Sequence, residues 1–467
     1  MPIETRPPSA ILETPTSAGR PWQEHALQIL WLMMLGLSLL DLDAHTLYAL
    51  QTATILGSLT LHVSMRPWSF RLVMVSQLAF LTIFVGELFG EYEVLRHVTS
   101  DAYIDLAAGY TSAAFAALMT GYWLIFTELH PSLQVHATTP RAMLAHRSDT
   151  LVVLVFAVMF VIFFADFGRL AVTVALYGRQ RATYATDAFG VIQSGLSSAA
   201  GVALPALLGH WILFVRRRSV WVLMLAISPV LLTHFASGTR FYLLFSVVSP
   251  LVMIYAGRRV GILVVARTVV VGLGLVIVAG IARTLRGFGY TGTSTIELDT
   301  LQVALAQSEG VVLINAQLID YFQRFDHLGG RSLASMLLFW IPRQVWPDKP
   351  TLIGFWFPRA YGIKVESGFS AAAGFCGDAY ADFGFTGGLL VCGLAGIALA
   401  MTEARVASWL IRREESAALG AIFFGGAFFG MRSPDTTFIM LMGATFWWFT
   451  YLGAFRLARV RGPVIDY

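Results

Sequence analysis

Long apolar stretches recur along this 467-residue chain and restrict its fold more than any other feature. A helix needs roughly 17 to 25 apolar residues to cross the hydrocarbon core of a bilayer. Because 57% of the residues are hydrophobic and only 13% are charged, a soluble globule of this composition would lack the polar surface to cover itself. The sequence therefore predicts an all-α protein that crosses a membrane many times.

Stretches of this length predict twelve membrane-spanning helices. They lie near residues 25–40, 47–65, 70–90, 104–128, 150–168, 190–215, 219–235, 241–256, 260–282, 384–404, 417–431 and 436–455. The first 24 residues carry prolines and glutamates but no apolar core, so we expect a tail there and no cleavable signal peptide. The chain then divides into a tail (1–24), spans one to nine (25–282), a long loop (283–383), spans ten to twelve (384–455) and a second tail (456–467).

Basic residues predict how these spans are oriented. If twelve spans alternate, the arginines of the short loops fall on one side, near residues 66–71, 141–147, 216–218, 258–259, 405–413 and 456–461. Positive residues collect in cytoplasmic loops, so we predict that this side is the cytoplasm and that both chain ends lie in it.

The long loop then faces outward, where an excess of basic residues is not expected. Many arginines nevertheless lie in it, and so do both lysines of the chain, Lys349 and Lys364. A guanidinium group stays charged when partly desolvated, and its planar fork matches two phosphate oxygens at once. Such a loop predicts an anionic ligand.

The outer loop falls into three parts. Residues 300–325 carry apolar side chains at helical spacing, with a break at Ser308, and predict two amphipathic helices along the membrane surface. The apolar run 333–341 is too short to cross the bilayer and predicts a re-entrant or interfacial piece. An extended strap is expected next, because each proline fixes its own φ and disfavours helix in the residue before it: Pro342, Pro347, Pro350 and Pro358.

Two further segments combine small residues with groups that can bind or react. Residues 367–384 are rich in Gly, Ala and Ser, which lets the backbone approach a ligand closely. Within them Asp378 and Asp382 are four residues apart and share one face if this piece is helical. Residues 234–240 join two predicted spans, and form either a plain hairpin or part of a site.

Four groups of residues occur in this order: Ser237-Gly238-Thr239-Arg240, Ile341-Pro342-Arg343, Trp346-Pro347-Asp348-Lys349-Pro350 and Gly377-Asp378-Ala379-Tyr380-Ala381-Asp382-Phe383-Gly384. Together they resemble the O-antigen polymerase (Wzy-like) family of oligosaccharide repeat-unit polymerases, over most of the chain. The chain departs from the family pattern in having Asp378 for a Glu, Asp382 for an Asn and Thr239 for a Ser. The carboxylate at position 378 therefore reaches one methylene less far.

The resemblance implies a glycosyltransferase of the bacterial inner membrane with a GT-C-like fold. Such enzymes transfer a growing glycan from one undecaprenyl diphosphate lipid to the nonreducing end of the next lipid-linked repeat unit, at the periplasmic face. No metal or other cofactor is expected. The expected partners are the undecaprenyl-diphosphate-linked oligosaccharide, membrane lipids, a flippase and a chain-length regulator, and no nucleic acid.

This reaction needs groups that stabilise the departing diphosphate and a group that takes the proton of the acceptor hydroxyl. Preorganised guanidinium groups can supply the first, and a carboxylate near the apolar boundary can supply the second. We expect Arg240 and Arg343 to act in catalysis, with Asp378 as the base and Glu366 among the alternatives to it. The residues expected to bind substrate are Arg359, Lys349, Tyr380, Arg283, Arg286, Arg432, His327 and Asp382.

Three alternatives stay open from the sequence. An O-antigen ligase would share the fold and the arginines but would transfer glycan to lipid A core. A flippase or transporter would be expected to carry charges along the interior of its spans, where this chain has few. Asp41 and Asp43 resemble the metal site of GT-C enzymes that use lipid monophosphate sugars, although the short loop around them favours a polar helix end.

Overall fold

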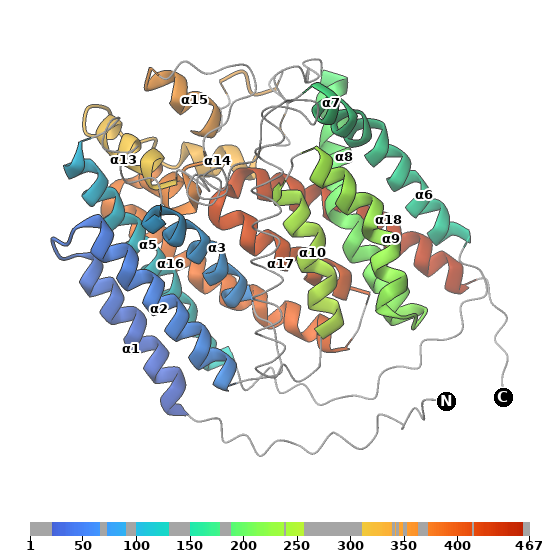
Figure 1. Ribbon diagram of the computed structural model, residues 1–467, viewed down its shortest axis with the longest axis horizontal. Helices are drawn as coiled ribbons and strands as arrows, with labels where there is room; N and C mark the ends of the chain where they lie inside the picture. Colours follow the sequence, from blue (N-terminus) through green and yellow to red (C-terminus); the bar gives the residue numbers. More distant parts are fainter. Residues whose placement is uncertain are drawn as a thin grey trace.

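The computed structural model describes residues 21–65, 72–89, 100–129, 150–177, 188–237, 240–255, 311–338, 341, 345–348, 353–362, 372–412 and 415–460. Within these ranges every regular element is a helix (Figure 1), as the sequence predicts.

The helices form three runs along the chain. The first run is α1 (Pro21–Ser38), α2 (Ala44–Met65), α3 (Leu72–Phe89) and α5 (Asp101–Leu129). The second is α6 (Thr150–Phe163), the π-helical turn η3 (Phe164–Gly168), α7 (Arg169–Tyr177), α8 (Ala188–Gly209), the π-helical turn η5 (His210–Val215), α9 (Val220–Ala236) and α10 (Arg240–Tyr255). The third is α13 (Val311–Phe322), α14 (Arg331–Leu337), α15 (Ile353–Ala360), α16 (Gly374–Arg412), α17 (Ala417–Arg432) and α18 (Pro434–Val460).

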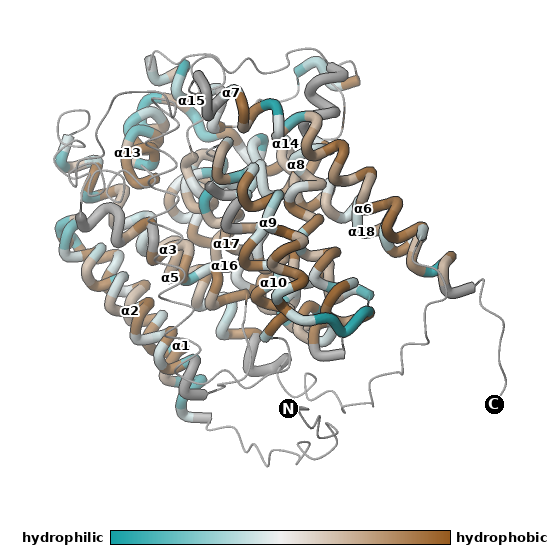
Figure 2. Tube along the Cα trace, turned by 45° about the vertical axis from the view of Figure 1, so that its right-hand side comes forward, coloured by the Kyte–Doolittle hydropathy of each residue, from teal (hydrophilic) through white to brown (hydrophobic). Residues whose placement is uncertain are grey.

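The positions of these helices agree with the predicted spans. Helical structure covers each predicted span except 260–282, which lies outside the described residues. Figure 2 shows hydrophobic residues along the middle of the bundle and hydrophilic residues gathered at its two ends. In the described part, four segments are both long and apolar enough to cross a membrane: Thr150–Thr173, Gly195–Val215, Gly374–Leu410 and Thr436–Ala458.

Buried side chains form two cores. The first core unites α1, α2, α3 and α5 with α13, α15 and the first part of α16, around large side chains such as Trp31 and Phe115. The second unites α6 to α10 with α17, α18 and the last part of α16, around Phe163 and Tyr451. We call these groups the first bundle and the second bundle. Because α3 and α16 contribute to both cores, they join the two bundles.

Helix α16 breaks at Gly384 and folds back on itself. Gly384 has a φ of +69°, a conformation that disfavours any residue with a Cβ. A Cβ added at Gly388 would lie 3.3 Å from the carbonyl carbon of Ala379, although nine residues of straight helix would separate the two positions by about 13 Å. The first leg of α16, residues 374–383, therefore packs against the second leg, which begins at residue 385.

Tyr110 of α5 holds the two legs together. Its phenol donates a hydrogen bond to the carbonyl oxygen of Cys376 at 2.9 Å. Its ring packs edge-on against Tyr380 of the first leg and Phe385 of the second, with centroids 5.0 and 5.4 Å away. A Cβ at Gly388 would lie 2.2 Å from the phenol oxygen, so glycine is needed there. The contact between α5 and α16 thus positions the segment that carries several predicted site residues.

The structure differs from two expectations for the outer loop. Helix α13 packs against α5 and α16 with eight of its twelve residues buried, instead of exposing the polar face expected of an amphipathic helix, because apolar side chains occupy several of its faces. Pro358 lies inside α15 and does not extend the chain. The proline has no N–H to donate to the carbonyl of Gly354, and the helix ends two residues later, at Ala360. Residues 300–310 and much of the predicted strap, including Pro342 and Pro350, lie outside the described residues.

Candidate functional site

The candidate site lies at the end of the first bundle where α13, α14 and α15 gather (Figure 1). The loop between α13 and α14, residues 323–330, runs along the first leg of α16. The backbone N–H of Leu328 donates to the carbonyl of Ala381, and that of Gly329 donates to the carbonyl of Asp382, each at 2.9 Å. Two segments that are distant in the sequence are therefore joined by backbone hydrogen bonds.

Asp382 caps the N-terminus of α14 from a different helix. Its side chain is buried, and its two carboxylate oxygens accept hydrogen bonds from the backbone N–H groups of Ser332 and Leu333, each at 2.9 Å. The first N–H groups of a helix have no partner within it, and Gly330, which precedes α14, has no side chain to offer. The carboxylate of Asp382 thus positions α14 and the loop before it, and the binding of substrate by Asp382 stays a prediction.

His327 lies in the same loop with its side chain exposed. Its imidazole stacks on Phe322 of α13, with centroids 5.2 Å apart and planes inclined by 22°, and meets Tyr380 edge-on at 5.4 Å. A Cβ at Gly384 would lie 2.9 Å from the Nε2 atom of His327, so the glycine break in α16 makes room for the ring. These contacts hold the imidazole in place and leave it accessible, which suits a group that binds a ligand or exchanges a proton.

The structure thus brings together three of the predicted site residues, His327, Tyr380 and Asp382. Asp378 lies one helical turn before Asp382 on the same leg of α16 and is half-buried. Tyr110, which orders this leg, carries no signal in the sequence that distinguishes it from other tyrosines of the spans.

The other predicted site residues lie on other helices or outside the described part of the chain. Arg359 is exposed in the last turn of α15, and Arg432 is the last residue of α17. Arg240 is the first residue of α10, and its side chain lies outside the described part. The contact between these guanidinium groups and Asp378 stays a prediction. Five more residues lie outside the described ranges: Arg283, Arg286, Arg343, Lys349 and Glu366.

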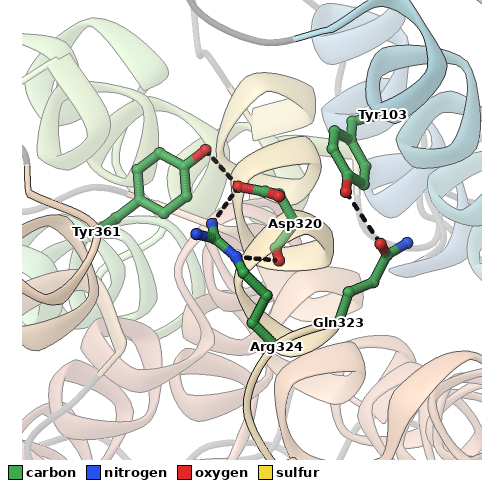
Figure 3. Close-up of polar contacts among 5 residues, drawn as sticks. All are labelled: Tyr103, Asp320, Gln323, Arg324 and Tyr361. Atoms are coloured by element: carbon green, nitrogen blue, oxygen red, sulfur yellow. Dashed lines mark hydrogen bonds and ion pairs between the residues drawn. The ribbon is translucent and has the colours of Figure 1, made fainter.

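A second polar cluster surrounds the last turn of α13 (Figure 3). Arg324 forms an ion pair with Asp320, whose carboxylate also accepts a hydrogen bond from the phenol of Tyr361 at 2.9 Å. Tyr103 of α5 donates to the amide oxygen of Gln323 at 2.9 Å. Partial burial and the carboxylate of Asp320 raise the pKa of Tyr361 to about 12, so its phenol stays a donor at neutral pH. The sequence does not predict this cluster, because the spacing of Asp320 and Arg324 is its one local signal.

The aspartates between α1 and α2 form a polar helix end. Asp43 accepts hydrogen bonds from the backbone N–H and the hydroxyl of Thr46, at 2.9 and 2.6 Å, and these bonds lower the pKa of its carboxyl group. This is the geometry of an N-cap for α2. Across the described ranges, no group of three or more His, Cys, Asp or Glu side chains is arranged to hold a metal ion.

No family model matches the chain, and it matches no curated protein and no solved structure.

Proposed function

We propose that this chain is a membrane glycosyltransferase that polymerises undecaprenyl-diphosphate-linked oligosaccharide repeat units into a surface polysaccharide. One observation carries the proposal. His327, Tyr380 and Asp382 come from segments far apart in the sequence, yet they form one cluster at a hydrophilic end of the first bundle. Asp378 lies on the same short leg of α16, so a candidate base lies within one helical turn of that cluster.

The proposed reaction needs no nucleotide, because a sugar on a lipid diphosphate is already activated. The bond between the anomeric carbon and the diphosphate oxygen breaks, and the electron pair leaves with that oxygen. The hydroxyl oxygen of the acceptor sugar forms the new bond to the anomeric carbon and gives its proton to Asp378. Guanidinium groups stabilise the charge on the departing diphosphate, a role for which we propose Arg240 and Arg343.

The remaining residues bind and position the substrate in this proposal. His327 contacts the sugars through its exposed imidazole, and the buried Tyr380 packs edge-on against that imidazole and orients it. Asp382 acts indirectly, since its hydrogen bonds to α14 hold the loop that carries His327. The residues proposed to bind the lipid diphosphate are Arg283, Arg286, Lys349, Arg359 and Arg432.

We also propose a GT-C-like arrangement of twelve spans in the bacterial inner membrane, with both termini cytoplasmic and the candidate site periplasmic. Helices α13, α14 and α15 lie together at one end of the bundle in Figure 1. The connection between α8 and α9 lies at the other end and carries the exposed residues Arg216, Arg217 and Arg218. Basic residues of this kind favour the cytoplasmic side.

Extension of a purified lipid-linked repeat unit by the purified chain in lipid vesicles tests the proposal. We expect a ladder of longer lipid-linked glycans that persists in the presence of a chelator. Asp378→Asn, Arg240→Ala and Arg343→Ala should each abolish the ladder with the protein level and insertion unchanged. Arg405→Ala, at the predicted cytoplasmic end of α16, is the matched control and should extend normally.

Other outcomes would replace the proposal or part of it. Transfer to lipid A core, with no transfer to a second lipid-linked unit, would identify a ligase. Movement of the lipid across the membrane without a new glycosidic bond would identify a transporter. A normal ladder from both arginine variants would defeat the assignment of those residues.

A further inference from the structure

The last turn of α13 carries an aromatic stack with one open face. Tyr321 and Phe325 stack with centroids 4.4 Å apart and planes inclined by 26°. Trp356 and Phe357 of α15 pack edge-on against Tyr321, with centroids 5.9 and 5.8 Å away. Phe357 is fully buried, whereas Phe325 is 55% exposed. The stack is therefore held firmly on its inner side and open to a ligand on its outer side.

Two planar hydrogen-bonding side chains, Gln323 and Arg324, directly precede Phe325 in the chain. Arg324 is 60% exposed, and its guanidinium donates from Nε to the backbone carbonyl of Asp320 and from a terminal nitrogen to the Asp320 carboxylate. These bonds orient the guanidinium and leave further N–H donors for a ligand. Gln323 accepts the hydrogen bond of Tyr103 through its amide oxygen, which leaves the NH2 end of the amide to donate elsewhere (Figure 3).

This combination fits a sugar ring better than a lipid headgroup. The C–H face of a pyranose packs on an aromatic ring, and its hydroxyl groups pair with side chains whose donors and acceptors are held in place. Anchoring at the headgroup level accounts for an exposed aromatic residue but needs no oriented amide or ion pair beside it. Three residues before Phe325, Phe322 stacks on His327, so the open ring lies next to the candidate site.

We propose that Phe325, with Arg324 and Gln323 at its edge, forms a sugar-binding subsite that holds a pyranose of the glycan away from the reacting bond. The inference rests on the proposed function for the identity of the glycan. It deepens that function by naming residues that hold a second sugar while the first one reacts at the cluster around His327.

Binding of a lipid-free glycan tests the subsite apart from catalysis. The probe is the oligosaccharide mixture released by partial hydrolysis of the source organism's surface polysaccharide, titrated by calorimetry into the full chain in nanodiscs. We expect Phe325→Ala and Phe325→Leu each to weaken binding about tenfold, the size expected when an aromatic platform is lost. Phe325→Tyr keeps the ring and should bind within about twofold of the wild type. Equal melting temperatures establish that the variants are folded.

The leucine variant separates a sugar platform from a membrane anchor, because it keeps an apolar side chain and loses only the ring. Wild-type binding by Phe325→Leu, or no binding by the wild type itself, refutes the subsite. The proposed function fails in a different way. If glycan binding depends on Phe325 but the chain extends no lipid-linked unit, the subsite stands and the chain is not a polymerase. If the wild-type chain extends units normally but Phe325→Leu binds glycan like the wild type, the polymerase proposal stands and the subsite is refuted.

Discussion

The two bundles use glycine in different ways. In the first bundle, α5 and α16 approach until backbone meets backbone, and a Cβ at Gly396 would lie 1.9 Å from the carbonyl oxygen of Leu118. In the second bundle, a Cβ at Gly425 would meet the ring of Phe245 at 2.4 Å. A ring can rotate away from a new methyl group, whereas a carbonyl oxygen moves only with its whole helix. Gly396 therefore marks a fixed contact in the first bundle, and Gly425 marks an adaptable one in the second.

The fixed contact lies beneath the candidate site. Between helices in a membrane, small residues allow close backbone packing, which replaces the hydrophobic driving force that operates in water. Helix α5 is held against α16 in this way, and Tyr110 of α5 orders the leg that carries Asp378 and Asp382. The second bundle packs rings against one another, such as His234 among Phe163, Phe167 and Tyr242. The close backbone contact thus lies where the proposed reaction needs placed groups.

The substitution expected to have the largest effect is Gly396→Ala. Its methyl group would overlap the backbone of α5, so we expect the free energy of unfolding to fall by about 3 kcal/mol. Thermal unfolding of the purified chain in detergent measures this loss. Gly57→Ala in α2 is the control, because no atom lies within 4 Å of its added Cβ. Equal melting temperatures for the two variants would show that α5 and α16 separate at little cost, and the contrast between the bundles would disappear.

Asp382→Ala is expected to rank second. It leaves the backbone N–H groups of Ser332 and Leu333 without their acceptor, and we expect a loss of about 2 kcal/mol together with faster amide hydrogen exchange at the start of α14. Glycan extension should fall as well, because the loop that holds His327 loosens. Asp378→Asn provides the counterpart: extension should be lost while amide exchange at the start of α14 stays at the wild-type value. Unchanged exchange in Asp382→Ala would contradict the capping role.

Gly425→Ala tests the adaptable bundle and should cost less, about 1 kcal/mol, since the ring of Phe245 can move. Shortening the neighbour should restore part of this loss, so the double variant Gly425→Ala/Phe245→Leu is expected to be more stable than the sum of the single changes predicts. Gly396→Ala offers no such rescue, because the obstacle there is the backbone of Leu118. If the stability changes of the two single variants simply add in the double variant, the ring of Phe245 does not move to make room for the methyl group.

The helices of both bundles could be predicted from apolar length, because a chain in lipid must satisfy its backbone hydrogen bonds within each segment. The contacts between helices could not. Gly396 and Gly425 lie in similar apolar runs, and their difference depends on which residue faces them across the interface. The fold-back of α16 could not be predicted from the sequence either, because the positive φ of Gly384, where the helix breaks, is supported by tertiary contacts of Tyr110.

The site was predictable only in part, for the same reason. The small and acidic residues of 377–384 indicate a functional segment, but its pairing with the α13–α14 loop depends on hydrogen bonds between distant residues. Asp382 illustrates the limit: the sequence shows a carboxylate at helical spacing from Asp378, and the structure shows that it caps another helix. At α13, sequence spacing allows the pair Asp320 and Arg324, whereas Tyr103 and Tyr361 reach it from elsewhere in the chain.

Helix caps provide the smallest test of the difference between the bundles. In the first bundle Asp43 caps α2 through Thr46, whereas in the second bundle the side chain of Ser219, at the start of α9, makes no capping hydrogen bond. We therefore expect Asp43→Ala to lower the free energy of unfolding by about 0.5–1 kcal/mol and Ser219→Ala to leave it unchanged, in thermal unfolding at neutral pH. If both substitutions lowered the free energy of unfolding equally, the loss would come from changes in the unfolded chain and not from a capping hydrogen bond.

The pH dependence of these two variants separates the charge of the cap from its hydrogen bonds. The bonds from Thr46 lower the pKa of Asp43, so the folded chain favours the ionised carboxyl group. Its contribution should be present at pH values above the ordinary pKa of an aspartate, about 4, and should be lost as the pH falls and the folded carboxyl takes up its proton. The stability gap between the wild type and Asp43→Ala is therefore expected to narrow in acid, while Ser219→Ala follows the wild type throughout. A gap that stays constant into acid would show that the Asp43 cap works without its charge.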